Sequence, residues 1–366
     1  MSGVVPDRYR HRLFAHEVID GIDHHWVWSP GGIHRSRSRR VANYVGFATA
    51  AAARAATLPR PSVVFVSSPP LTVAPLGPLL ARRFGRPWIL EVRDIWPESA
   101  VSVGWLRRES SVYALLERVS HRVTTAADSV VIPTPGLEPF VKAHGARAVV
   151  TLTGAAVPRA FDADRRAAAR ARFAIRDEDC VFVYAGALGV ANDVSELLEA
   201  VRRVPAGITF RILIAGAGSA REALERELEN DRALERVTLL PPVPIDEVDD
   251  LLAAADVGLH LLRPDPVFMS ALPSKILDYL GAGLPFITTV PGLPAQIAAD
   301  SSGSSVASRD ELAREVQRWA ERSPAERKRR GEQAFAYGQE QFGFDTGVAR
   351  LEALLAEVTA PSERRR

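Results

Sequence analysis

Residues 180–200 read CVFVYAGALGVANDVSELLEA. A largely apolar run ends at the small residues Gly186, Ala187 and Gly189, and residues 194–204 then place apolar side chains at helical spacing. This order predicts a buried strand, a tight turn and an amphipathic helix. Because the same succession recurs along the chain, it decides the fold class.

Further strands and helices follow the same alternation on both sides of this stretch. Strands are predicted at 62–67, 87–92, 129–133, 148–152, 180–186, 209–216, 236–241, 256–262 and 285–289, and helices at 71–84, 111–127, 136–145, 194–204, 219–230, 246–255, 274–281, 309–321 and 325–358. Short runs that are apolar throughout are typical of parallel strands covered on both faces. Their alternation with helices predicts doubly wound α/β sheets. The charged stretch 162–179 interrupts the pattern, and we expect it to link two such sheets.

The composition limits the class of protein. The chain has 366 residues, 47% hydrophobic and 25% charged, with a net charge of only +2. These values predict two folded domains and no general affinity for nucleic acid. The single cysteine, Cys180, follows the pattern of a core residue and excludes a disulfide framework. No apolar run reaches the length of a membrane span, and the first residues lack the apolar centre of a signal peptide. The sequence therefore indicates a cytosolic enzyme.

Open α/β sheets bind ligands at the carboxyl ends of their strands, so the loops after strands are the candidate sites. The turn Gly186-Ala187-Leu188-Gly189 precedes a helix for which Asp193 fits the N-cap and Glu196 completes a capping box. Small residues before a helix N-terminus allow a phosphate to approach the backbone. A tight turn that binds nothing explains the same residues, and Asp193 would repel an anion.

A second loop, LPSKILDYLGAGLPFI at 272–287, opens a helix at Ser274 and places Lys275 in its first turn. A cation there opposes the helix dipole, which a bound diphosphate would offset. Asp278 lies three residues later on the same helical face. The alternative is a solvated Lys–Asp ion pair.

A third loop, EVRDIWPESA at 91–100, follows a predicted strand with Asp94 and Glu98 on either side of a Trp96-Pro97 pair. The preceding strand ends in Ser67 and Ser68, which we expect to lie beside this loop. The two loops together indicate one wall of a ligand site. A helix N-terminus with acidic residues in its first turn is the simpler explanation.

Together these three loops resemble glycosyltransferase family 4, retaining enzymes of the two-domain GT-B fold, and more narrowly its branch with a D-L-W-P-E-S motif. The segments RDIWPESA and PSKILDYLGAGLPF are the specific parts, YAGALG is less specific, and the likeness runs from residue 20 to residue 357.

The resemblance implies transfer of a hexosyl or N-acetylhexosaminyl group from a nucleotide-diphosphate sugar, such as a UDP sugar, with no metal and no other cofactor. It implies a catalytic or orienting role for Asp94, with Glu98 as a second candidate, and an acceptor side near Ser67, Ser68 and Trp96. The implied donor-binding residues are Gly186, Ala187, Leu188, Gly189, Arg263, Ser274, Lys275 and Asp278. Among these, Lys275 neutralises the leaving nucleotide and Asp278 accepts hydrogen bonds from its ribose.

The chain departs from the family pattern in four ways. Ser270 stands where many members have Glu, and the ribose carboxylate is Asp278 rather than Glu. Ala187 and Asn192 replace a basic pair, a charge that Arg263 could supply. The first twenty residues contain no convincing strand and no Gly-Gly loop, so the opening βαβ unit of the first domain is expected to be missing. That loss would leave an exposed sheet edge.

The resemblance also implies the domain limits: an abbreviated acceptor domain at 1–160, a donor domain at 161–335, a helix at 336–358 that returns to the first domain, and a disordered tail at 359–366. The acceptor is either a lipid-linked glycan of surface polysaccharide synthesis or a small natural product. The basic stretch IHRSRSRR, 33–40, fits either a contact with anionic lipid at the inner membrane face or a solvated loop. Two other functions stay open: a non-catalytic partner of a true transferase, and a sugar-nucleotide epimerase.

Overall fold

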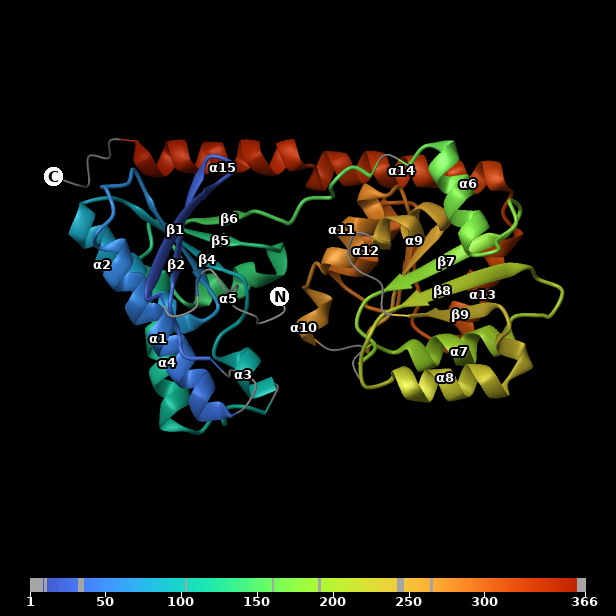
Figure 1. The fold of residues 1–366 in the computed structure, drawn as a ribbon, viewed down its shortest axis with the longest axis horizontal. Helices are drawn as coiled ribbons and strands as arrows, with labels where there is room; N and C mark the ends of the chain where they lie inside the picture. The colour runs from blue at the N-terminus through green and yellow to red at the C-terminus, as the bar shows by residue number, and fades with distance from the viewer. Residues whose placement is uncertain are drawn as a thin grey trace. The chain divides into compact units, whose positions relative to one another are not determined.

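The computed structural model describes residues 9, 12–31, 36–102, 104–159, 161–189, 192–241, 247–263 and 266–360. The chain forms two compact units, which are described separately: unit 1 contains residues 1–152 and 351–366, and unit 2 contains 153–350 (Figure 1). The division precedes the predicted limit at 160 because the intervening segment is bonded to unit 2. The backbone N–H of Ala156 donates to the Phe342 carbonyl at 2.7 Å, and that of Arg159 donates to the Gly281 carbonyl at 2.9 Å.

Unit 1 is built on a parallel sheet of four strands in the order β3-β4-β5-β6. The strands are β3 (Val64–Ser68), β4 (Trp88–Val92), β5 (Ser129–Ile132) and β6 (Val149–Thr151). The other elements are α1 (Arg37–Ala55), η2 (Leu71–Val73), α2 (Leu76–Phe84), α3 (Glu98–Ser102), α4 (Ser111–Ala126), η3 (Pro135–Leu137), α5 (Glu138–Ala143) and the end of α15 (Phe344–Thr359). Alternate strand residues face opposite sides, so both faces carry apolar side chains. One face packs on residues of α2 and α4, and the other holds Ile89 and Val131 against Leu354 of α15.

An antiparallel hairpin in unit 1 corrects the expectation that the first twenty residues hold no strand. Strands β1 (Phe14–Ile19) and β2 (Ile22–Val27) pair from Phe14 opposite Val27 to Ile19 opposite Ile22. The two turn residues, Asp20 and Gly21, have φ of 52° and 79°. Asp-Gly favours this tight hairpin turn, and it is the sequence signal that the prediction missed.

Unit 2 contains a parallel sheet of six strands in the order β12-β11-β10-β7-β8-β9. The strands are β7 (Cys180–Ala185), β8 (Phe210–Ala215), β9 (Val237–Leu240), β10 (Val257–His260), β11 (Phe286–Thr288) and β12 (Ser304–Ser305). The helices are α6 (Ala163–Arg172), α7 (Val194–Arg203), α8 (Arg221–Asn230), η4 (Arg232–Leu234), α9 (Val248–Ala254), α10 (Pro266–Met269), α11 (Ser274–Gly281), α12 (Leu293–Asp300), α13 (Arg309–Glu321), α14 (Pro324–Phe342) and the start of α15.

The two faces of this sheet are covered by different helices. Phe182 faces a cluster that includes Trp319 of α13 and residues of α7, while Val183 faces a second cluster with residues of α9 and α11. Cys180 is fully buried in the first cluster, which confirms its assignment to the core. Burial strongly raises the pKa of its thiol, so Cys180 is no nucleophile.

The structure also differs from the sequence expectation in the linker and in the C-terminal helix. The stretch taken as a linker contains helix α6, which begins because the Asp162 side chain accepts a 2.7 Å hydrogen bond from the backbone N–H of Arg165. The long helix predicted at 325–358 is two helices, α14 and α15, which meet at Gly343 with an extended ψ of 149°.

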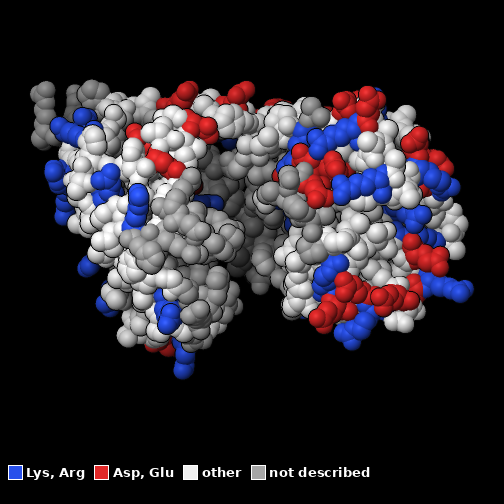
Figure 2. Space-filling view, in the orientation of Figure 1, with Lys and Arg blue, Asp and Glu red and all other residues white. Residues whose placement is uncertain are grey.

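On the face shown in Figure 2, basic and acidic side chains intermix over unit 2 and form no extended patch of one sign. No helix within the described residues is long and apolar enough to cross a membrane. The first residues of the basic stretch 33–40, Ile33, His34 and Arg35, lie outside the described residues, as do 361–366 of the predicted tail.

Candidate functional site

The carboxyl ends of β7 and β8 carry two turns that pack backbone to backbone. A Cβ atom at Gly216 would lie 1.8 Å from the Gly186 carbonyl oxygen, and one at Gly218 would lie 2.3 Å from the Leu188 carbonyl oxygen. Only glycine permits this approach. The backbone N–H of Gly186 also donates to the Ala215 carbonyl at 2.9 Å. The turn after β7 is therefore held rigidly, at the edge of the sheet where ligands bind.

Lys275, in the first turn of α11, points its amine at this turn. A Cβ atom at Gly186 would lie 3.0 Å from Nζ, and Nζ lies 4.2 Å from the centre of the Tyr184 ring. The Nζ atom is buried and has no hydrogen-bond partner among the described residues. Burial lowers the pKa of Lys275 to about 8. Since a buried ammonium without an anion is unfavourable, this geometry is typical of a site for an anionic ligand.

His260, which sequence reasoning missed, lies at the carboxyl end of β10 and is completely buried. Its Nδ1 atom lies 2.9 Å from Oγ1 of Thr288, and its Nε2 atom is buried with no partner among the described residues. Burial, and then the charge of Lys275, lower the pKa of His260 to about 3. The ring is therefore neutral at pH 7. The sequence signal that could have identified His260 is a histidine near the end of a predicted strand.

Asp278 does not pair with Lys275. Its Oδ1 atom lies 2.6 Å from Nη2 of Arg159, a second residue that the sequence did not single out. Arg159 also forms an ion pair with Asp249 at the start of α9. The solvated Lys–Asp pair considered from the sequence is thus absent between these two described side chains. The carboxylate of Asp278, which was expected to bind a ribose, forms an ion pair with the guanidinium of Arg159.

The remaining predicted donor residues are grouped around the same turn. Nε of Arg263 lies 3.7 Å from Oδ1 of Asp193, so its positive charge is close to the helix that follows the turn. The carbonyl of Ala187 accepts a 2.7 Å hydrogen bond from the Tyr184 hydroxyl. Leu188 is fully buried. Gly189 accepts from the Asn192 backbone at 3.0 Å, and Ser274 is the exposed first residue of α11.

The expected capping box of α7 does not form. Asp193 occupies the N-cap position, but its side chain accepts no capping hydrogen bond from the helix backbone. Glu196 instead receives two hydrogen bonds from Arg309, at 2.5 and 2.7 Å. The bidentate guanidinium is the stronger partner for this carboxylate.

In unit 1, Glu98 is the first residue of α3 and Asp94 lies in the bend that precedes this helix, which is compatible with both interpretations of the sequence. Oδ1 of Asp94 accepts hydrogen bonds from the Ile95 backbone at 2.8 Å and from the Ser99 hydroxyl. One oxygen of Glu98 accepts from the Tyr113 hydroxyl. That hydrogen bond, followed by burial, raises the pKa of Tyr113 to about 12.

The acceptor-side candidates lie beside this loop. The Ser67 hydroxyl donates to Glu91, and the Ser68 carbonyl accepts from the Arg93 backbone at 2.8 Å. Trp96 is partly buried against the core of unit 1. Ser68, Asp94 and Trp96 share the lining of one small depression, so the structure brings them together.

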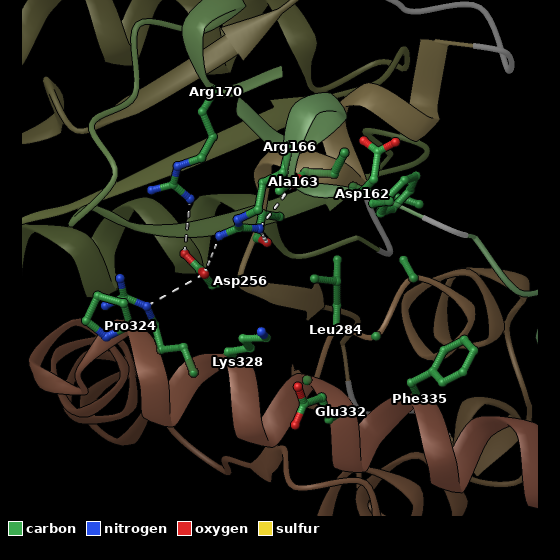
Figure 3. Close-up of a pocket in the computed structure, with 18 of the residues that line it drawn as sticks. Asp162, Ala163, Arg166, Arg170, Asp256, Leu284, Pro324, Lys328, Glu332 and Phe335 are labelled. Carbon is green, nitrogen blue, oxygen red and sulfur yellow. Dashed lines mark hydrogen bonds and ion pairs between the residues drawn. The ribbon is translucent and has the colours of Figure 1, made fainter. Parts of the chain in front are cut away.

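A cavity of about 760 Å³ lies elsewhere in unit 2 (Figure 3). It is lined by α6, α14 and Asp256, which directly precedes β10, so it opens at the amino ends of the strands. Asp256 forms ion pairs with Arg166 at 2.7 Å and with Arg170 and Arg327 at 3.6 Å (Figure 3).

These three arginines also donate to backbone carbonyls, and in this way they attach α6 and α14 to the sheet. Arg166 donates to the Ala253 and Ala255 carbonyls and Arg170 to the Ala254 carbonyl, all at the end of α9. The helix carbonyls offset the excess positive charge. The cluster therefore has a structural role and is separate from the candidate site.

Comparisons with known proteins give a family match to part of the chain and one curated relative. Residues 179–322, which include the turn, His260 and Lys275, match the family described as glycosyl transferases group 1. A probable glycosyltransferase, WbjE from Pseudomonas aeruginosa, is 26% identical over 237 residues, a match that spans 63% of this chain and 58% of that protein. The match thus covers less than two thirds of the relative.

Solved structures resemble most of the chain. Sucrose-phosphate synthase from Thermosynechococcus elongatus has a TM-score of 0.70 at 16% identity, covering 96% of this chain and 87% of that one. HepE from Anabaena, solved in complex with UDP, has a TM-score of 0.66 at 15% identity, covering 85% and 82%. The two parallel sheets and these neighbours show that the chain has the two-domain, Rossmann-like GT-B fold of glycosyltransferases, with a group 1 match over residues 179–322.

Proposed function

We propose that this protein is a glycosyltransferase that moves a sugar from a UDP sugar to an acceptor hydroxyl with retention of configuration. The observation that carries the proposal is the buried amine of Lys275 beside the Gly186 turn, which has no hydrogen-bond partner in the described part of the chain. A diphosphate placed there would receive the charge of Lys275 and the dipole of α11. Stabilising the charge on the departing nucleotide is the largest contribution expected in such a transfer.

Similarity supports the nucleotide and the reaction class. WbjE is named a probable glycosyltransferase, and HepE has been solved with UDP and with UDP-glucose. In the proposed complex, Asp278 accepts hydrogen bonds from the ribose, and the guanidinium of Arg159, 2.6 Å from Oδ1, competes for this carboxylate. Arg263 adds positive charge next to the turn.

We assign Asp94 to the acceptor. Its Oδ1 atom holds the start of α3, while Oδ2 receives no hydrogen bond from the described residues. That oxygen can orient an acceptor hydroxyl and accept its proton. The Asp94→Asn variant is expected to bind UDP normally and to lose transfer, whereas Asp278→Ala is expected to lose UDP affinity. The other proposed elements are a lipid-linked or small-molecule acceptor, a cytoplasmic location with peripheral membrane contact, and metal independence. Measuring transfer in the presence of EDTA tests the metal independence.

The first test is release of UDP from UDP-glucose or UDP-N-acetylglucosamine without acceptor, measured by ion-exchange chromatography. The full chain is expected to release UDP slowly, and Lys275→Met is expected to stop release. Lys328→Met, which removes an exposed lysine of the same unit, is the matched control. A chain that binds and releases nothing would be a non-catalytic partner. Conversion of the sugar without UDP release would identify an epimerase.

A further inference from the structure

His260 is a buried polar residue at the candidate site for which the described residues supply only one partner. The ring is fully buried, its Nδ1 atom meets the Thr288 hydroxyl at 2.9 Å, and Nε2 has no partner among the described residues. Buried polar atoms are rarely left without a hydrogen bond. A partner from outside the described protein atoms is therefore needed.

The hydrogen bonds of Thr288 decide which nitrogen carries the proton. Its Oγ1 atom accepts a 3.1 Å hydrogen bond from the Val290 backbone, and the described residues give it one other contact, with His260. Thr288 is itself fully buried. If Nδ1–H donated to Oγ1, the hydroxyl hydrogen would have no acceptor within the described structure. The hydroxyl therefore donates to Nδ1, and the proton of the neutral ring resides on Nε2.

The Nε2–H group faces the same region as the Lys275 amine. His260 pairs with Thr288 across β10 and β11, and its neighbour two residues earlier, Gly258, lies against the Tyr279 ring of α11. Alternate residues of a strand share a face, so His260 lies on the face covered by α11, the helix that begins with Lys275. Two buried donors without acceptors thus occur at one edge of the sheet.

We propose that His260 is a binding residue of this site: its Nε2–H group donates to an oxygen of the diphosphate that Lys275 also binds, and Thr288 positions the ring by donating its hydroxyl hydrogen to Nδ1. The inference rests on the proposed function, because it names a further residue of the same diphosphate site. A neutral donor adds a directional hydrogen bond without a second buried positive charge. Because Nε2 already carries its proton and Nδ1 is occupied by the Thr288 hydroxyl, the role of His260 is recognition and not proton transfer.

The test is isothermal titration calorimetry, which measures the affinity of the full chain for UDP, inorganic pyrophosphate and uridine. In His260→Asn, the shorter amide replaces Nδ1 and leaves the Nε2 position empty; in His260→Gln, the longer amide restores a donor there. Affinity for UDP and pyrophosphate is expected to fall about tenfold to a hundredfold in His260→Asn, the range for a hydrogen bond to a charged group. His260→Gln is expected to recover most of this loss, and uridine should not respond to either change.

A second pair of variants guards against failure to fold. Thr288→Ser keeps the hydroxyl and should bind pyrophosphate normally, while Thr288→Val should bind it several-fold more weakly. Nitrogen-15 spectra of histidine-labelled protein, assigned by difference, should show His260 as the Nε2–H tautomer, and its Nε2–H signal should move when pyrophosphate is added.

The outcomes separate the two proposals. If the unmodified chain binds neither UDP nor pyrophosphate, the diphosphate site and this inference both fail. If the unmodified chain binds both, Lys275→Met loses them and His260→Asn retains them, the site stands and the role of His260 is refuted. An Nδ1–H tautomer would refute that role as well.

Discussion

Replacing Lys275 with methionine is expected to make the ligand-free protein more stable while it removes ligand binding. The pKa of Lys275 falls from 10.5 to about 8 because its amine is buried. Each pKa unit corresponds to about 1.4 kcal/mol, so holding the ammonium in this position costs roughly 3 kcal/mol. The contact of Nζ with the Tyr184 ring, whose centre is 4.2 Å away, offsets about 0.5–2 kcal/mol of this cost. Methionine fills similar space without the charge.

The expected gain is therefore about 1–3 kcal/mol in the free energy of unfolding of unit 2, or roughly 5 °C in its melting temperature. The gain also depends on pH. Below pH 8 the lysine is charged in both the folded and the unfolded chain, and the full cost is present. Between pH 8 and 10.5 the unfolded chain binds more protons, so the unmodified protein gains stability as pH rises and the advantage of methionine disappears.

The assay is thermal unfolding of the unmodified chain, Lys275→Met and the control Lys328→Met at pH 7 and pH 10.5. The control changes an exposed lysine and is expected to stay within about 0.5 kcal/mol of the unmodified chain. A Lys275→Met protein that is less stable than the unmodified chain at pH 7 would refute the reasoning. It would mean that the free protein already satisfies this amine.

Three further perturbations follow from other contacts. Asp256→Asn leaves a buried arginine cluster without its carboxylate and should lower the stability of unit 2 by about 3–5 kcal/mol in urea titration; a loss below 1 kcal/mol would contradict the structural role. The pKa of Tyr113 is raised to about 12 by its bond to Glu98, so stability present below pH 10 should be lost between pH 10 and 12, and Tyr113→Phe should not show this loss. Arg159→Ala frees Asp278, and UDP affinity in calorimetry should rise by up to about fivefold with pyrophosphate affinity unchanged; weaker UDP binding would show that the guanidinium contacts the nucleotide.

Local sequence signals were sufficient where the element is defined by its own residues. Helix α11 spans Ser274–Gly281 as predicted, because Pro273 precedes it and Gly283, with a φ of 68°, follows shortly after its end. The parallel strands were recognised from their continuous apolar runs. The hairpin β1–β2 was missed although Asp20-Gly21 marks it, since its strands mix polar and apolar residues and are partly exposed.

The site was less predictable because its contacts join distant residues. Asp278 contacts Arg159, which is 119 positions away in the sequence, and His260 contacts Thr288, which is 28 positions away. The packing of Gly216 on Gly186 likewise depends on the order of β7 and β8 in the sheet. Residue type and spacing identified Lys275 and the turn as candidates. Only the folded arrangement shows that the amine is buried, faces the turn and has no hydrogen-bond partner among the described residues.

The most direct measurement of the central claim is a thermal-shift series with UDP, GDP, dTDP and pyrophosphate on the unmodified chain and on Lys275→Met. A ligand at a hundredfold excess over its dissociation constant adds about 2.7 kcal/mol to stability. We expect a clear shift with UDP on the unmodified chain and none on Lys275→Met. An equal UDP shift on both proteins, or none with any nucleotide on folded protein, would contradict a diphosphate site at the carboxyl edge of this sheet.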